Sequence, residues 1–318
     1  MIPDHASDAT PRWSPEPSVH DDRQLREFVS GLAPGRRVEY VGTLRRRTVR
    51  LHRFRLIGAD PDEIVVKVFT TTMAAERAFG ALERLAAVVG TGNFDLRSMP
   101  PLALARSVPA LAMPYVAGPT LRDVLAQEPW RTASVMVRAG RVLAGLHQLS
   151  REASEGSAGA ELTPRTRLAS LGRTAEAATS SELVRRYVDF HPHNLLLAGE
   201  DSIVVIDPPL RDEVTHVHHD IVNFLYKAQK CLVVPPWDQA RARYLLDLTD
   251  AAAGFLGAYF AAAERPISSA DVVMLDRYLT LYATVRSRPS QWREDLPHQA
   301  LFAPLLRQQL RRALRQVS

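Results

Sequence analysis

The sequence predicts an α+β protein in which a small antiparallel sheet carrying one helix is followed by a larger, mainly helical region. Three strand-like runs precede residue 70, an amphipathic helix follows them directly, and strand patterns become rare beyond residue 120. The chain has 318 residues, of which 46% are hydrophobic and 24% charged, so it is long enough to bury the cores of two packed lobes.

Three segments with different compositions divide the chain. Residues 1–20 contain four prolines and few apolar side chains, which predicts a disordered N-terminal tail. Residues 21–116 hold the strand-like runs and form the predicted first lobe. Residues 117–318 form the predicted second lobe, in which helical patterns dominate.

The predicted first lobe begins with a short helix over residues 21–32. Strands are predicted at 38–41, 48–56 and 64–69; the second alternates polar and apolar residues and the third is more apolar. Thr71 or Thr72 can cap the helix predicted over residues 73–89. Two further apolar runs, 102–104 and 110–113, lead to a turn or hinge at 115–119.

Helices dominate the prediction after the hinge. A short helix is expected at 120–126, a long amphipathic one at 132–149 and another near 181–186, whereas the Ser-, Gly- and Ala-rich stretch 152–163 reads as a loop. From Asp220 onward the sequence is mostly helical, with breaks at prolines. Clefts between two lobes of this kind are where ligands usually bind.

Composition narrows the functional classes. The single cysteine, Cys231, cannot form an intrachain disulfide, and the N-terminus lacks the apolar core of a signal peptide. No uncharged segment is long enough to span a bilayer, so a cytoplasmic protein without integral membrane association is predicted. The formal net charge of +5, mostly from arginine, indicates attraction to anions but does not choose among nucleotides, acidic substrates and nucleic acid.

The segment with the clearest chemical pattern lies between residues 187 and 209. Two apolar runs flank a short polar turn and predict a hairpin, with Asp189, His191 and Asn194 before it and Asp207 after it. Because a hairpin brings its ends together, two carboxylates and an amide are expected to face one point. Such oxygen-rich sites suit Mg²⁺, which often shares its ligands with phosphates.

This pattern resembles the catalytic loop and metal-binding Asp of the aminoglycoside phosphotransferase and choline kinase-like family, whose fold is protein-kinase-like and bilobal. The resemblance rests on DFHPHN at residues 189–194 and IDP at 206–208, and it gains weight from weaker matches in the same order. These are VVKV at 65–68, MPYVAGPTL at 113–121 and LAGLH at 143–147, and together they cover roughly residues 36 to 225.

The resemblance implies an ATP- and Mg²⁺-dependent small-molecule kinase. Its first lobe, residues 21–116, would bind the nucleotide, and its second lobe, residues 117–318, would carry the catalytic loop, the metal site and the helices that bind the acceptor. Asp189 would orient the acceptor hydroxyl and accept its proton, with His191 bracing the loop. Asn194 and Asp207 would hold Mg²⁺ on the phosphates, and Lys67 would pair with the α- and β-phosphates. The hinge backbone at Tyr115 and Val116 would bind adenine.

The sequence departs from the family in three places. Tyr187 and Val188 replace the usual His-Gly before the catalytic Asp, and the expected phosphate loop has arginines after Gly42 where glycines are usual. The helix glutamate that should pair with Lys67 is assigned to Glu76, with Glu83 as a second candidate, although the family's register falls on Ala78.

Several functions stay open from the sequence. The acceptor of the kinase could be an aminoglycoside, another antibiotic, a sugar or an amino alcohol, and the basic net charge argues against a polycationic aminoglycoside. The alternative is a non-catalytic kinase-like module that binds a nucleotide. Nucleic-acid binding ranks last because no aromatic-basic interleaving accompanies the arginines. The histidines at 216, 218 and 219 also allow a zinc site, although no second ligand cluster is evident.

Overall fold

The computed structural model describes residues 13, 22–45, 49–89, 96–97, 99–155, 183–185, 190–199, 202–207, 214–232, 248–285 and 303–317. These residues fall into two compact units. The sheet unit contains the described parts of Met1–Thr91, Arg97–Pro119 and Leu196–Arg211, and the helical unit contains those of Gly92–Leu96, Thr120–Leu195 and Asp212–Ser318. The sheet unit is therefore built from three separate stretches of chain. The observed architecture is the predicted α+β one.

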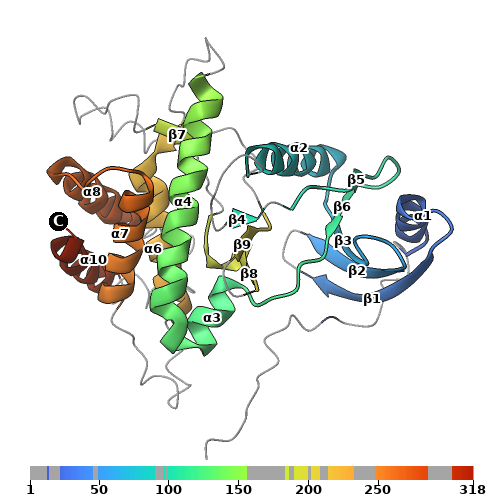
Figure 1. Cartoon of the computed structure of the whole chain (residues 1–318), viewed down its shortest axis with the longest axis horizontal. Helices are drawn as coiled ribbons and strands as arrows, with labels where there is room; N and C mark the ends of the chain where they lie inside the picture. The colour runs from blue at the N-terminus through green and yellow to red at the C-terminus, as the bar shows by residue number, and fades with distance from the viewer. Residues whose placement is uncertain are drawn as a thin grey trace, which may run out of the picture. The chain divides into compact units, whose positions relative to one another are not determined.

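The sheet unit is built on five antiparallel strands in the order β1-β2-β3-β6-β5 (Figure 1). Their bounds are β1 Arg37–Arg45, β2 Arg50–Ile57, β3 Glu63–Val68, β5 Ala103–Leu104 and β6 Ala110–Pro114. Lys67 lies opposite Leu51 on β2 and Leu111 on β6, so it belongs to the central strand. The strands predicted at 38–41, 48–56 and 64–69 are confirmed, and β1 is longer than expected.

The alternation of side chains along the strands builds two hydrophobic clusters, one on each face of the sheet. Ile64 and Val66 share one cluster with residues of helix α1 (Asp22–Leu32), and Val65 shares the other with residues of helix α2 (Thr72–Val89). Thr71 caps α2 as expected, because its Oγ1 accepts a hydrogen bond of 3.2 Å from the backbone N of Ala74. Lys67 is two residues after Val65 on the same strand, so its side chain points to the same face of the sheet, the one that α2 covers.

A second small sheet carries the predicted hairpin. Strands β8 (Leu195–Ala198) and β9 (Ser202–Val205) pair, and β4 (Leu96–Arg97) adds to β9. Ala198 and Val204 belong to the same hydrophobic cluster as Val65, so the hairpin packs on the Lys67 face of the large sheet. The hairpin between the two apolar runs is thus confirmed.

Gly118 makes the close approach between the hinge and this hairpin possible. A Cβ at Gly118 would lie 2.0 Å from the carbonyl oxygen of Leu197, and its φ of 147° lies in the region that side chains rarely adopt. One residue later, the Pro119 carbonyl accepts a hydrogen bond of 3.0 Å from the backbone N of Leu197. The hinge backbone and β8 are therefore directly joined.

The helical unit is organised around α4 and α7, which approach closely at a glycine. A Cβ at Gly140 on α4 would lie 2.3 Å from the carbonyl oxygen of Phe255 on α7, which only a glycine allows without a shift. Phe255 in turn stacks on Phe224 of α6, with ring centroids 4.8 Å apart. The bounds of the helices are α3 Leu121–Gln127, α4 Thr132–Glu155, α6 Val217–Leu232, α7 Thr249–Ala262, α8 Ser269–Val285 and α10 Ala303–Val317, with 3-10 turns η1 Pro129–Arg131 and η3 Pro192–Asn194.

Two predictions for the helical unit were wrong in part or in full. The helix expected near 181–186 is a strand, β7 (Leu183–Arg185), which pairs antiparallel with β10 (Val214–His216). Val184 in its centre is only 2% exposed, so burial and pairing with a distant segment override the local helical pattern. The loop expected at 152–163 begins as helix, because α4 runs on to Glu155.

Two further expectations concern the ends of the chain and membranes. Of the predicted tail, residues 1–20, only Trp13 is described, and it is half-buried. Among the described helices, none combines the length and the apolar character that crossing a bilayer would require.

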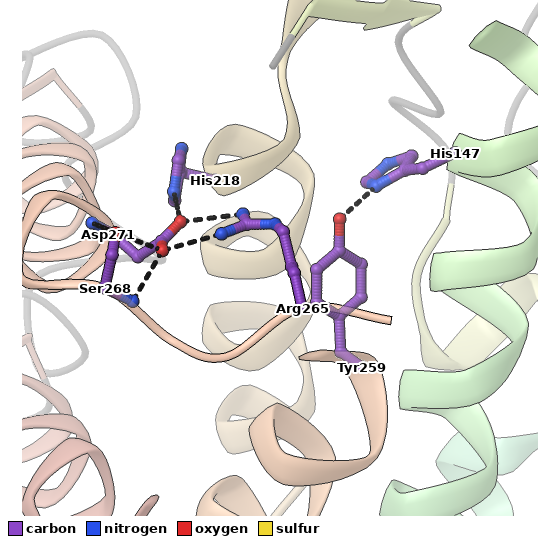
Figure 2. A network of polar contacts seen from close by, with 6 residues as sticks. All are labelled: His147, His218, Tyr259, Arg265, Ser268 and Asp271. Carbon is purple, nitrogen blue, oxygen red and sulfur yellow. Dashed lines mark hydrogen bonds and ion pairs between the residues drawn. The ribbon is translucent and has the colours of Figure 1, made fainter. Parts of the chain in front are cut away.

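The start of α8 is held by a buried polar network around Asp271 (Figure 2). Arg265 donates two hydrogen bonds of 2.7 and 2.8 Å to this carboxylate, and His218 on α6 lies 2.7 Å from it through Nε2. Ser268 adds hydrogen bonds from its hydroxyl and backbone N at 2.6 and 2.8 Å. Burial opposes ionisation, but the hydrogen bonds from His218, Arg265 and Ser268 hold the pKa of Asp271 well below its ordinary value.

We expect Asp271→Ala to lower the free energy of unfolding by about 3–5 kcal/mol, because it leaves buried donors and an arginine without their shared acceptor. Urea denaturation followed by circular dichroism measures this loss. Asp276→Ala is the matched control, since Asp276 also lies on α8 and pairs with two arginines, Arg307 and Arg311, but its side chain is 29% exposed. Its loss should cost about 1 kcal/mol or less. Equal losses in the two variants would contradict the role given to burial.

Candidate active site

Lys67 and Asp207 form the central contact of the candidate site. Nζ of Lys67 donates a hydrogen bond of 2.8 Å to Oδ1 of Asp207, across 140 residues of sequence. The Lys67 side chain is 8% exposed and that of Asp207 is 37% exposed, so the lysine is enclosed while the carboxylate is accessible. Because β3 is the central strand and the side chain is enclosed, Lys67 is not an edge-strand lysine with a solvated head.

The local sequence explains why the two residues meet. Lys67 stands between two buried valines on the central strand, on the face against which the β8–β9 hairpin packs. Asp207 comes two residues after β9 ends, and Ile206 before it packs into the same cluster as Val65. A buried lysine without a partner would be costly, and the carboxylate supplies that partner. Both residues belong to the sheet unit.

His191 and Asn194 lie in a compact turn directly before β8. His191 is the N-cap of η3; its Nδ1 accepts a hydrogen bond of 3.2 Å from the backbone N of His193, and its carbonyl accepts one of 2.9 Å from the backbone N of Asn194. Burial, together with the nearby charges of Lys227 and His193, lowers the pKa of His191 to about 3. A neutral imidazole that accepts a backbone hydrogen bond is suited to holding the turn, which is the role expected for it.

Asp189 itself lies outside the described residues, but the residues after it are anchored. Phe190 is 1% exposed, and its ring centroid lies 5.3 Å from that of Phe224 on α6. Pro192 is buried as well. Asn194 belongs to the helical unit and Asp207 to the sheet unit. The convergence of Asp189 and Asn194 on Asp207 therefore stays a prediction.

The hinge residues Tyr115 and Val116 follow β6. The backbone N of Tyr115 donates a hydrogen bond of 2.9 Å to the carbonyl of Glu63, and Val116 packs against the cluster on the Lys67 face. The Tyr115 ring lies under the guanidinium of Arg53, with Cζ 3.7 Å from the ring centroid. The same ring makes a T-shaped contact with the indole of Trp13, with centroids 6.3 Å apart and planes at 76°.

Sequence reasoning missed the roles of Arg53, Glu63 and Trp13 around the hinge. Arg53 shares the parity of Leu51 on β2, so strand alternation alone could have placed it on the Lys67 face. Its guanidinium bonds to Glu63, which also accepts from Arg55. Burial of Glu63 raises its pKa, but the two arginines outweigh it and the net pKa is lowered. No pattern in the sequence marks Trp13.

Glu76 is not joined to Lys67. It is exposed on α2, and no hydrogen bond or ion pair between the described atoms of the two residues exists; Lys67 pairs with Asp207 instead. The cause is the helical register, because Ala75 and Ala78 face the core at 0% and 2% exposure and turn the intervening Glu76 outward. Glu83, the second candidate, is exposed too.

Helices α4 and α6 of the helical unit meet through buried histidines. His147 on α4 lies 3.4 Å through Nε2 from Asp220 on α6, and its Nδ1 lies 2.8 Å from the hydroxyl of Tyr259 (Figure 2). His219 binds the other oxygen of Asp220 at 3.0 Å. Burial opposes ionisation of Asp220, but the hydrogen bonds from His147 and His219 hold its pKa well below the ordinary value. Within the described residues, no three His, Cys, Asp or Glu side chains gather as metal ligands, and His218 and His219 bind different carboxylates.

Comparisons with known proteins identify the fold. No family model and no curated protein matches the sequence. Among solved structures, the streptomycin–ATP complex of APH(2″)-IIa matches with a TM-score of 0.50 and 12% identity over 92% of this chain and 99% of that one. The GDP and kanamycin complex of APH(2″)-IIIa matches with a TM-score of 0.49 and 14% identity over 92% and 97%. The macrolide 2′-phosphotransferase of Brachybacterium faecium matches with a TM-score of 0.45 and 18% identity over 86% and 92%.

At these identities the likeness concerns the fold, and the match to APH(2″)-IIa spans almost the whole of both chains. The antiparallel sheet with α2, the hairpin that follows residues 189–194 and the helices after it are the parts that the sequence patterns had assigned to such a kinase. The chain therefore has the protein-kinase-like α+β fold of the aminoglycoside phosphotransferases.

Proposed function

We propose that this protein is a phosphotransferase that moves the γ-phosphate of ATP, in a Mg²⁺-dependent reaction, to a hydroxyl group of a small molecule. The observation that carries the proposal is the ion pair between buried Lys67 and accessible Asp207. A fixed ammonium beside a carboxylate provides one group for a phosphate oxygen and one for a metal ion, which is what a metal–triphosphate complex requires.

The residues have separate roles in this reaction. Asp207 and Asn194 offer the hard oxygen ligands that Mg²⁺ prefers, and Lys67 would exchange Asp207 for the α- and β-phosphates. Bound Mg²⁺ would supply neutralisation of the charge on the phosphates. Tyr115 and Val116 offer backbone groups to the base.

In the transfer step, the acceptor oxygen forms a bond to the γ-phosphorus while the bond from that phosphorus to the β–γ bridging oxygen breaks. Asp189 accepts the proton of the acceptor hydroxyl, and ADP leaves with the bridging oxygen. Positioning and neutralisation of charge supply most of the catalysis in such a reaction. His191, neutral and hydrogen-bonded to the backbone, would hold Asn194 rather than move a proton.

The acceptor class is a hydroxylated small molecule such as an aminoglycoside, another antibiotic, a sugar or an amino alcohol. The solved structure of APH(2″)-IIa, which has a similar fold, is a complex with streptomycin and ATP, which supports an acceptor of this size. A panel of such compounds, screened for acceptor-dependent release of ADP from ATP, tests the proposal directly. Failure of every acceptor to raise ADP release above the rate with ATP alone would count against it.

The second candidate is a kinase-like module that binds a nucleotide without transferring phosphate. The exposed position of Glu76 favours it, because Lys67 then lacks the second carboxylate that holds the lysine in active kinases of this type. Nucleotide binding with no hydrolysis and no transfer across the panel would support the module. Slow hydrolysis of ATP in the absence of an acceptor would support the phosphotransferase.

Lys67→Met is expected to lower kcat/KM for ATP about 10²–10³-fold, because it removes a positioned cation from the transferring phosphates. Steady-state ADP release with the best acceptor measures the loss. Arg23→Ala is the matched control, since Arg23 is a 92% exposed cation on α1 of the same unit and should leave the rate unchanged. Equal rates for Lys67→Met and the wild type would remove Lys67 from the site.

A further inference from the structure

Trp13 lies on the surface that the proposed function assigns to the nucleotide base. Its ring meets the Tyr115 ring edge-on, and it packs against the cluster on the Lys67 face that contains Val65 and Met113. Val116 and Ile206 belong to the same partly buried surroundings. The residues around the indole thus come from the hinge, from the strands beside Lys67 and from the segment that ends in Asp207, all within the sheet unit.

The indole is held there by aromatic and apolar contacts, without a hydrogen bond of its own. Its Nε1–H is completely covered by protein atoms, and among the described residues no acceptor lies within hydrogen-bonding distance. A buried donor without an acceptor carries the cost of its lost hydration, whereas a purine brings groups that can bond to the hinge backbone. The indole therefore covers an apolar surface of the hinge region. Its contact is less favourable than that of a base, because a base would also form hydrogen bonds with the hinge backbone.

We propose that Trp13 occupies the base-binding surface as an internal competitor, so that the nucleotide must displace the indole before it binds. This inference rests on the proposed function, because it takes Tyr115 and Val116 as the contacts of the base. The Nε1–H group of the indole is enclosed by protein atoms, which leaves no room for a base beside it. The base would therefore replace the indole on this surface and would not bind next to it. Trp13 thereby lowers the population of the binding-competent form.

The expected result is that Trp13→Ala tightens the binding of MgATP. If about nine-tenths of the free protein has the indole in place, the apparent Kd falls about tenfold when the indole is removed. Titration calorimetry with MgATP on the full chain measures this change. Trp130→Ala is the matched control, since Trp130 is 75% exposed in the helical unit, and its Kd should equal that of the wild type.

Trp13→Phe separates competition from a general effect of the N-terminal segment. Phenylalanine retains an aromatic ring for the apolar surface and lacks the unpartnered donor, so its Kd should stay at or above the wild-type value. An unchanged or weaker Kd in Trp13→Ala, or a fall in Trp13→Phe as large as that in Trp13→Ala, overturns the inference while nucleotide binding itself stands.

A second measurement follows the indole itself. In a chain whose other three tryptophans are replaced by phenylalanine, Trp13 fluorescence should be protected from acrylamide without nucleotide and become quenchable when MgATP is added. Protection that persists at saturating MgATP overturns the inference alone. A protein that binds no MgATP in either the wild-type or the Trp13→Ala form overturns the proposed function, and the inference falls with it.

Discussion

Asp207→Ala is expected to lower kcat about 10²–10³-fold and to weaken the binding of MgATP, because the variant loses a carboxylate that would hold the metal on the phosphates. ADP release at saturating acceptor and calorimetric titration with MgATP measure the two effects. Asp207 is 37% exposed, which is the accessibility a metal ligand needs.

The same substitution also leaves Lys67 buried without its partner. A lone buried ammonium is costly, so Asp207→Ala should be less stable than the wild type, and adding Lys67→Met should restore part of the stability without restoring activity. Thermal denaturation of the single and double variants shows whether this happens. Wild-type affinity for MgATP in Asp207→Ala would be incompatible with a metal-binding role.

Asp189→Ala is expected to remove phosphoryl transfer almost completely while leaving the fold and ATP affinity largely intact. A positioned general base contributes about 10²–10⁴-fold to rate, and the nucleotide contacts proposed here lie on other residues. Single-turnover transfer to the best acceptor and calorimetric ATP titration, performed on the same preparation, separate the chemical step from binding.

The control for Asp189→Ala is a substitution in the turn that follows Asp189. His191→Ala would remove the imidazole that accepts from the backbone of His193 and is expected to loosen the turn without removing the base. Its activity should fall less than that of Asp189→Ala. If Asp189→Ala turned over at the wild-type rate, or lost ATP binding in parallel with activity, the base assignment would be wrong.

The parts of the fold with strong periodicity were predictable. The strand that carries Lys67 and the hairpin that ends in Asp207 have continuous apolar runs, and the order of the motifs related the two residues across 140 positions. The contact itself was not predicted, because the family resemblance assigned Glu76 as the partner of Lys67 and nothing local in either segment encodes a pairing with Asp207.

The failures have physical causes that act over long distances. The strand at Leu183–Arg185 exists because it pairs with Val214–His216, a segment about thirty residues further along the chain. The outward position of Glu76 follows from which face of α2 the sheet buries, and a shift of one residue reverses it. Ser268 and Asp271 form a readable capping pair, whereas the addition of His218 to it depends on how α6 packs against α8.

Gly118 ties the hinge to the hairpin that ends near Asp207. Because only a glycine permits the contact of the hinge with Leu197, the hinge backbone and β8 are held directly against each other within the sheet unit. A larger side chain at 118 would have to push these two segments apart. Under the proposed function, one substitution at this position would therefore shift the contacts of the base and the metal-binding carboxylate together, although neither contact involves residue 118 itself.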